Sequence, residues 1–219
     1  MAKQKSQPQD NFLFDDLANS FEHSEQINVP TPDSLEQIQH DLQHSHTCGV
    51  CKPGMPTVFG IGRAPTELML IGEGPGIDDL QSAEPFSGQA GVLLNRMLAA
   101  INQARASVYL CNVIKCIPPG ERIFSAEEIE DCRPLLLRQI LVVRPKVILA
   151  LGALAAQTLL RSKKTISDLR GQQFTYKLND LTTTLIPTFN PAYLLRVAEK
   201  KREAWEDLKA ARALLSPAL

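Results

Sequence analysis

A chain of 219 residues with 44% hydrophobic residues is long enough for one sizeable domain, since domains usually run to about 100–200 residues. No segment approaches the run of about eighteen apolar residues that spans a membrane, and the N-terminus lacks the apolar run of a signal peptide, so we expect a cytoplasmic protein outside the membrane. The formal net charge is −1, but residues 1–46 hold two Lys and no Arg against eight acidic residues, a net of −6, which leaves +5 for the rest. A moderately basic domain is compatible with a polyanionic partner.

Residues 1–45 are expected to form a flexible acidic leader, because the first 32 are rich in Gln, Asn, Asp, Ser and Pro. A short helix is predicted from Asp33 or Ser34 to about Ser45. The leader also carries an apolar patch that could dock onto an unknown protein partner or onto the domain itself, made of Phe12, Leu13, Phe14 and Leu17. The sequence leaves both alternatives open. All four His of the chain lie in its first 46 residues.

Residues 46–215 alternate expected strands with expected helices and form the predicted domain. The strands are predicted at 68–71, 108–113, 146–151, 172–178 and 182–188, and the helices at 88–101, 125–143, 152–160 and from Pro191 onward. Ser125 and Glu128 match a capping box at the start of the second helix. This alternation predicts an α/β fold, a three-layer αβα sandwich around a central, mostly parallel sheet of four to five strands.

The stretch 68–79, LMLIGEGPGIDD, places acidic side chains directly after a buried strand. Its glycines and proline force a sharp turn, and open α/β sheets bind their ligands at turns that follow the carboxyl ends of strands. Glu73, Asp78 and Asp79 are therefore candidate site residues. The alternative is a glycine-rich loop with solvated acids.

Four cysteines have the spacing of a metal site. Cys48 and Cys51 form a C-x2-C pair, while Cys116 and Cys132 are fifteen residues apart. Four thiolates would hold either zinc or an iron–sulfur cluster, and two unrelated pairs of free thiols remain an alternative. Cys111 lies inside an expected strand and is interpreted as a buried free thiol.

Four motifs stand in order along the domain: GEGPGIDD at 72–79, EPFSGQAGVLL at 84–94, CNVIKCIPPGER at 111–122 and NPAYLLR at 190–196. Together with the cysteines, residues 46–210 resemble the family 4 uracil-DNA glycosylases, the iron–sulfur branch of the uracil-DNA glycosylase superfamily. The resemblance implies an enzyme that acts on uracil-containing DNA, and we expect it to be a monomer. It also implies a structural 4Fe-4S cluster, held by Cys48, Cys51, Cys116 and Cys132.

The resemblance further implies roles for the residues of the first three motifs. Phe86 would stack on a flipped uracil, and Asn112 would read the edge of the base. Glu73 and the backbone of Gly74 would lie around the sugar and the attacking water. Asp79 would lie at the C5 side of the base, where it helps to exclude thymine, while Asp78 is expected to be solvated.

The last motif departs from the family, which usually begins it with a His that donates to uracil O2. Here the position is Asn190, which can donate a hydrogen bond but cannot become a cation. Leu194 and Leu195 match the loop that wedges into the duplex, and Arg196 matches the residue that holds phosphate.

Two functions follow from these observations. The first is hydrolysis of the N-glycosidic bond of uracil in DNA, which leaves an abasic site. The alternative is a divergent member with weakened or redirected activity, either a glycosylase for another deaminated base or a lesion-binding protein. A generic dinucleotide-binding fold ranks last, because GEGPG lacks the G-x-G-x-x-G spacing.

Overall fold

The structure is a computed structural model that describes residues 22–28, 33–45, 48–51, 54–118 and 122–216. The apolar patch predicted at 12–17 lies outside these residues. Among the described residues, no helix is long and apolar enough to cross a membrane.

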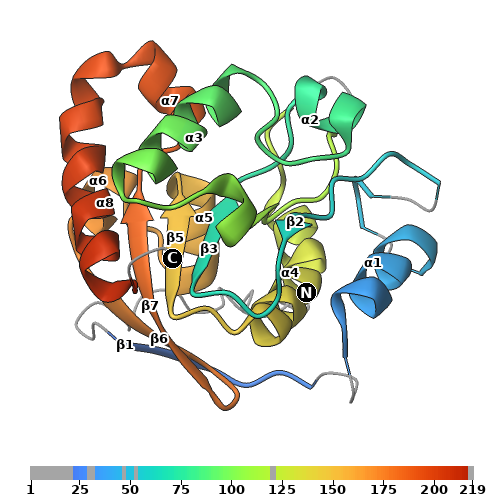
Figure 1. Cartoon of the computed structure of the whole chain (residues 1–219). Coiled ribbons are helices and arrows are strands. Elements are labelled where there is room, and N and C mark those ends of the chain that lie inside the picture. The colour runs from blue at the N-terminus through green and yellow to red at the C-terminus, as the bar shows by residue number, and fades with distance from the viewer. Residues whose placement is uncertain (1–21, 29–32, 46–47, 52–53, 119–121, 217–219) are drawn as a thin grey trace, which may run out of the picture.

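A single mixed sheet runs through the middle of the molecule, in the order β1-β6-β7-β5-β3-β4-β2 (Figure 1). Its inner strands β4, β3, β5 and β7 are parallel, while β2 and β6 run antiparallel to their neighbours β4 and β7. The bounds are β1 Glu22–Glu25, β2 Ile61–Gly62, β3 Leu68–Gly72, β4 Tyr109–Asn112, β5 Val147–Leu151, β6 Phe174–Leu178 and β7 Leu181–Thr188.

The predicted three-layer α/β fold is confirmed, but the predicted strand number is wrong. The sheet has seven strands rather than four to five. The two strands that the sequence missed lie at the edges, where β1 reads Glu-His-Ser-Glu and β2 is only two residues long. Edge strands are commonly short or carry charged side chains, which discourages pairing with other chains, so no apolar run marks them in the sequence.

Helices cover both faces of the sheet, and each face has its own core (Figure 1). On one face, α3 and α8 pack against the sheet; on the other, α4 and α5 do so, and α1 packs on the outside of α4. The bounds are α1 Leu35–His44, α2 Ile77–Ser82, α3 Gln89–Ala100, α4 Ala126–Val143, α5 Ala153–Leu160, α6 Ile166–Leu169, α7 Pro191–Arg196 and α8 Lys201–Leu214, with short 3-10 turns at Arg105–Ser107 and Ala198–Lys200.

The helix caps that the sequence predicts at the starts of α4 and α1 are confirmed. Ser125 accepts from the backbone N–H of Glu128 at 3.2 Å, and the Glu128 carboxylate accepts from the Ser125 N–H at 2.8 Å, which closes the capping box of α4. Ser34 is the N-cap of α1, and its hydroxyl accepts from the backbone N–H of Gln37. Both helices therefore start where the sequence predicts.

Parts of the expected leader are attached to the domain. β1 pairs in parallel with β6, and Glu25 forms a bidentate ion pair with Arg133 of α4. Arg138, also on α4, binds Asp33 at 2.7 and 2.9 Å and Asp41 at 2.8 Å. These contacts hold residues 22–25 and 33–44 against the sheet and its helical layer.

The terminal helix is interrupted, although a continuous helix from Pro191 was predicted. α7 ends at Arg196, where Val197 leaves the helical region at φ −126° and ψ 76°, and α8 begins only at Lys201. The interruption lets α7 sit across the carboxyl edge of the sheet while α8 returns along its face (Figure 1).

Candidate active site and cysteine cluster

The candidate site lies at the edge of the sheet where four parallel strands end. β3 ends at Gly72, β4 at Asn112, β5 at Leu151 and β7 at Thr188. The segments that follow these strands carry the site residues predicted from the motifs, so the fold brings distant parts of the chain together at the edge where α/β proteins bind ligands.

Asn112 and Phe86 meet above Gly72. A Cβ at Gly72 would lie 2.3 Å from Asn112 Oδ1 and 2.5 Å from Phe86 Cζ, so only glycine fits between them. Asn112 is 1% exposed, and its Nδ2 has no hydrogen-bond partner among the described residues. A buried donor without a partner costs about 1–3 kcal/mol, and such a group in a native fold calls for a ligand or a similar explanation.

The loop that carries Phe86 is held in an uncommon conformation. Phe86 has φ +57°, in the left-handed region that non-glycine residues rarely adopt. Asp79 accepts from the Ser87 backbone N–H at 2.8 Å and the Ser87 hydroxyl at 2.9 Å, and also from the Gly76 N–H at 3.1 Å. The buried Asp79 carboxylate therefore ties the GEGPG turn to the Phe86 loop, whereas Asp78 is exposed as expected.

Glu73 is half-buried and fixed from two sides. Its Oε1 accepts from the Leu154 backbone N–H at 3.0 Å, in the first turn of α5, and its Oε2 accepts from Asn190 Nδ2 at 3.3 Å. The positive end of a helix stabilises a carboxylate in this position. Gly152 makes the approach feasible, because it has φ +105° and a Cβ there would lie 2.6 Å from Glu73 Oε1.

Asn190 is the N-cap of α7. Its Oδ1 accepts from the Ala192 N–H at 2.9 Å, and its Nδ2 donates to the Leu151 carbonyl at 3.3 Å as well as to Glu73. All the polar atoms of this amide are therefore engaged within the protein, between the Glu73 carboxylate and the start of α7.

Sequence reasoning missed three residues of this edge. Gly152 and Leu154 hold Glu73. Phe124 packs on Gly74, where an added Cβ would lie 2.8 Å from Phe124 Cζ. The glycine directly after the apolar strand 147–151 was a signal for a close backbone approach. Nothing in the local pattern around Phe124 indicates that its ring packs on Gly74.

The three residues predicted to contact DNA do not share one environment. Leu194 is 1% exposed and belongs to the core under α7, whereas Leu195 is 46% exposed and Arg196 is also exposed. Phe189 stacks on Tyr193 of α7, with their ring centroids 5.3 Å apart. Leu195 and Arg196 are therefore the members of this set that face solvent.

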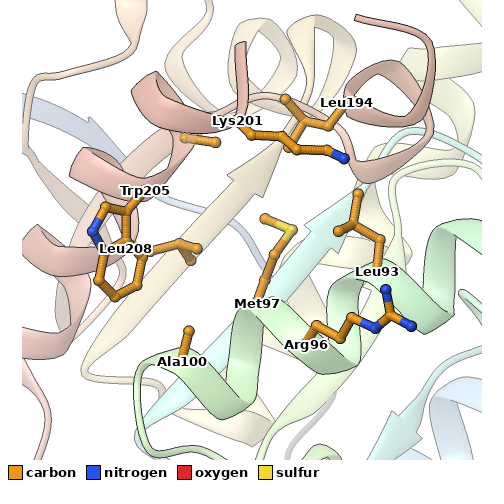
Figure 2. A pocket seen from close by; sticks show the side chains of 9 residues that line it. Leu93, Arg96, Met97, Ala100, Leu194, Lys201, Trp205 and Leu208 are labelled. Atoms are coloured by element: carbon orange, nitrogen blue, oxygen red, sulfur yellow. The ribbon is translucent and has the colours of Figure 1, made fainter. Parts of the chain in front are cut away.

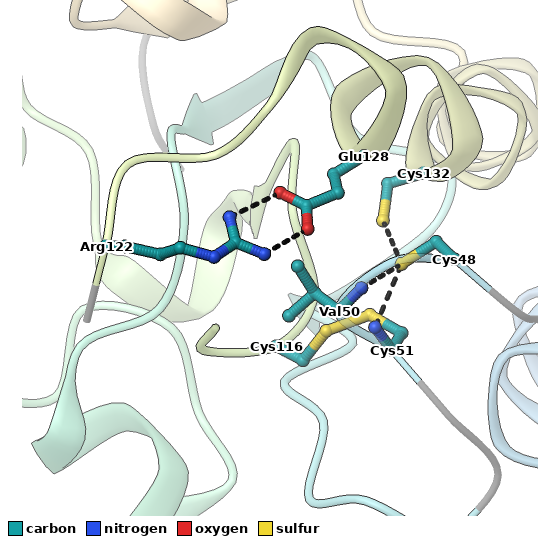
Figure 3. Close-up of a disulfide and its surroundings, with 7 residues drawn as sticks. All are labelled: Cys48, Val50, Cys51, Cys116, Arg122, Glu128 and Cys132. Carbon is teal, nitrogen blue, oxygen red and sulfur yellow. Dashed lines mark hydrogen bonds and ion pairs between the residues drawn. A yellow bond between two sulfur atoms is a disulfide. The ribbon is translucent and has the colours of Figure 1, made fainter. Parts of the chain in front are cut away.

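The four predicted cysteines converge at one place, between the loop at 48–51, the segment after β4 and α4 (Figure 3). The sulfur atoms of Cys48, Cys51 and Cys132 lie within 4.8 Å of one another, and Cys51 is joined to Cys116 by a disulfide. Cys48 Sγ accepts from the backbone N–H of Cys51 at 2.9 Å and of Val50 at 3.3 Å. Cys111 is buried in β4 and is not part of this group.

This donor set fits an iron–sulfur or zinc site when all four sulfurs are reduced. Burial, together with the neighbouring Cys48, raises the pKa of the Cys132 thiol to about 12. A metal ion deprotonates a coordinating thiol outright, and backbone N–H groups aimed at sulfur stabilise the resulting charge. Arg122 and Glu128 form an ion pair beside the group, next to Gly49, whose Cβ would lie 2.9 Å from Glu128 Oε1 (Figure 3).

Comparison with known proteins gives consistent matches. The family model of the uracil DNA glycosylase superfamily matches residues 59–209, a range that contains all four motifs. A type-4 uracil-DNA glycosylase of Thermotoga maritima is 38% identical over 184 residues, which cover 83% of this chain and 94% of that protein. A type-4 uracil-DNA glycosylase of Archaeoglobus fulgidus is 35% identical over 181 residues, which cover 81% of this chain and 91% of that protein.

A type-5 uracil-DNA glycosylase of Pyrobaculum aerophilum matches only 54 residues, 25% of this chain, at 39% identity. The similarity to the type-4 proteins, by contrast, extends over more than four fifths of the chain. The chain therefore belongs to the type-4 branch of the uracil-DNA glycosylase superfamily.

Proposed function

We propose that this protein is a DNA-repair glycosylase that extrudes uracil from DNA and hydrolyses its N-glycosidic bond, as the names of its type-4 relatives indicate for those proteins. The observation that carries the proposal is the unpaired, buried Nδ2 of Asn112 beside the ring of Phe86. An apolar ring face next to a free amide is what a flipped base needs.

The amide also accounts for the choice of base. Asn112 Nδ2 would donate to uracil O4 and its Oδ1 would accept from N3–H, because an amide offers both functions. Cytosine presents an amino donor at C4, which would oppose the Nδ2 donor. Asp79, which fixes the Phe86 loop, would restrict the space on the C5 side of the base, where thymine carries its methyl group.

Hydrolysis adds water across the bond between C1' and N1, which yields an abasic sugar and free uracil. The transition state separates a positive sugar from a negative base, so a carboxylate near the sugar and donors near the base lower the barrier. Glu73 and the backbone of Gly74 would serve the sugar and the water. Asn190 acts through its hydrogen bond to Glu73.

The DNA partner would contact the exposed side of α7. Leu195 would enter the base stack left open by the extruded uracil, and Arg196 would bind phosphate, while the buried Leu194 anchors the helix beneath them. We further propose that the protein works as a cytoplasmic monomer.

The experiment is an excision assay on oligonucleotides that contain uracil, hypoxanthine, xanthine or thymine, single- or double-stranded, with abasic product as the readout. The type-4 matches favour uracil over redirected activity towards another base. Asn112→Ala should lower uracil excision by about 10²–10³-fold, the usual loss when one transition-state hydrogen bond is removed. Asn95→Ala, at an exposed position on α3, is the control and should act like the wild type. Absence of abasic product at enzyme excess would overturn the proposal.

We also propose that Cys48, Cys51, Cys116 and Cys132 hold a 4Fe-4S cluster once the Cys51–Cys116 disulfide is reduced. The cluster would supply a structural cross-link between the loop at 48–51, the segment after β4 and α4. Iron and acid-labile sulfide should be found in protein purified without oxygen. Stoichiometric zinc without iron would contradict this assignment.

A further inference from the structure

A groove of about 220 Å³ lies between α3 and α8 (Figure 2). Its floor is apolar, with Leu93 and Met97 from α3, Trp205 and Leu208 from α8, and Leu194 from α7. Two cations also line it, Arg96 and Lys201. Small-molecule pockets usually measure about 300–1,000 Å³, so this groove suits a few side chains better than a cofactor.

The two cations lie at one end of the groove, on either side of Leu93, while Trp205 and Leu208 lie at the other end (Figure 2). Both cations are exposed, and in the described part of the chain neither forms an ion pair with a carboxylate. An occupant with apolar side chains at its centre and acidic side chains beside them would pack on the apolar floor and also pair with the two cations.

We propose that residues 10–17 of the leader, DNFLFDDL, occupy this groove in the same molecule. The segment carries Phe12, Leu13, Phe14 and Leu17 as apolar anchors, and three Asp with no basic residue among them. The aromatic and aliphatic anchors match the floor in character, and the acids are complementary to Arg96 and Lys201.

The connection to the described chain permits this arrangement. Eight residues lead from Phe14 to Glu22, the first residue of β1, and they can span at most roughly 26–29 Å. α8 has 14 residues and is about 21 Å long, so the leader can pass across it. In the view of Figure 1, β1 lies at the lower left, below α8, and a tether this short gives an effective concentration of about millimolar.

Trp205 is the single tryptophan of the chain and lines the groove, so its fluorescence reports occupancy. The test compares the full-length wild type with Phe12→Ser, Leu13→Ser and Phe14→Ser combined. The triple variant should show a red-shifted emission and easier quenching by acrylamide. The matched control, Gln4→Ser, Gln7→Ser and Gln9→Ser combined, changes three polar residues that precede the segment and should retain the wild-type emission. Equal emission and quenching in all three proteins would overturn the proposal.

Charge reversal separates this contact from a general change of the fold. Arg96→Glu with Lys201→Glu should expose Trp205 as the triple variant does, and adding Asp15→Lys with Asp16→Lys should restore the protected emission. A photo-crosslinking residue in place of Leu13 should link to α3 or α8 of the same chain. A crosslink between two chains, or Trp205 emission that follows a monomer–dimer equilibrium on dilution, would assign the groove to a second copy and sink the proposal.

Discussion

At the residue scale, the position of Glu73 depends on a glycine that has no side chain to contribute. Gly152 adopts φ +105°, and a Cβ there would collide with Glu73 Oε1 at 2.6 Å. Gly152→Ala should therefore displace the carboxylate from the start of α5 and lower uracil excision by about 10²-fold, the loss that a misplacement of about 1 Å can cause.

Gly152→Ala would also strain the backbone at a positive φ, and this strain by itself could lower activity. A second glycine with a positive φ is therefore the control. Gly171 has φ +75°, but a Cβ at this position would meet no atom within 4 Å, so Gly171→Ala carries the backbone strain without the collision. Steady-state excision and thermal unfolding of both variants separate the two effects. Equal losses of activity in the two variants would show that Glu73 is not held in the proposed way.

At the element scale, Asn190 both caps α7 and donates a hydrogen bond to Glu73. Two substitutions separate the capping role from the contact with Glu73. Asn190→Ala removes both contacts, and loss of an N-cap costs about 0.5–2 kcal/mol of stability. Asn190→Ser keeps a capping oxygen but is too short to reach Glu73. We expect Asn190→Ser to unfold near the wild-type temperature, Asn190→Ala to unfold at a lower one, and both to excise uracil slowly. Wild-type activity in Asn190→Ser would contradict the link.

The edge strand β1 should be sensitive to acid. Burial by itself would raise the pKa of Glu25, but the nearby His23 ring and the bidentate hydrogen bonds from Arg133 hold it at about 2, below the ordinary 4.5. A lowered pKa in the folded state stabilises the fold above pH 4.5, and this contribution is lost as the pH falls towards 2. Glu25→Gln should therefore speed hydrogen exchange in β1 and β6 at about pH 7 and lose its effect in acid.

Removal of a surface carboxylate provides the comparison for Glu25. Glu130 pairs with Arg161 at 2.5 Å but is about half exposed, and exposed ion pairs contribute little stability. Glu130→Gln should leave the exchange of β1 unchanged at either pH. If the two variants behave alike, the Glu25–Arg133 pair does not fasten the strand.

The buried elements could be predicted from the sequence, whereas the contacts between loops could not. The continuous apolar runs at 68–71 and 146–151 indicate strands buried on both faces, and the motif order indicates which loops share an edge. β1 reads Glu-His-Ser-Glu and is held by backbone pairing and an ion pair to α4. Its sequence therefore has no alternating apolar pattern from which a strand could be predicted. Likewise, the helix breaks at Val197 although no proline or glycine marks the position, and the sequence pattern did not indicate that Leu194 is buried.

At the scale of the whole molecule, the cysteine group joins segments that are otherwise far apart in sequence. Cys48 and Cys51 lie before the first buried strand, Cys116 follows β4, and Cys132 lies on α4. A metal cluster that binds the folded but not the unfolded chain stabilises the fold by its binding free energy. Loss of one ligand should therefore affect the metal content and the stability together.

Cys132→Ser should yield protein with little iron and a lower unfolding temperature, because the remaining three thiols no longer anchor α4. Cys111→Ser is the matched control, since Cys111 is equally buried at 0% exposure but lies in β4 outside the group. That variant should keep its iron, even though a buried hydroxyl costs some stability. We would measure iron content, visible absorption and thermal unfolding of both variants side by side. Full iron in Cys132→Ser, or loss of iron in Cys111→Ser, would show that the cluster is held by another set of ligands.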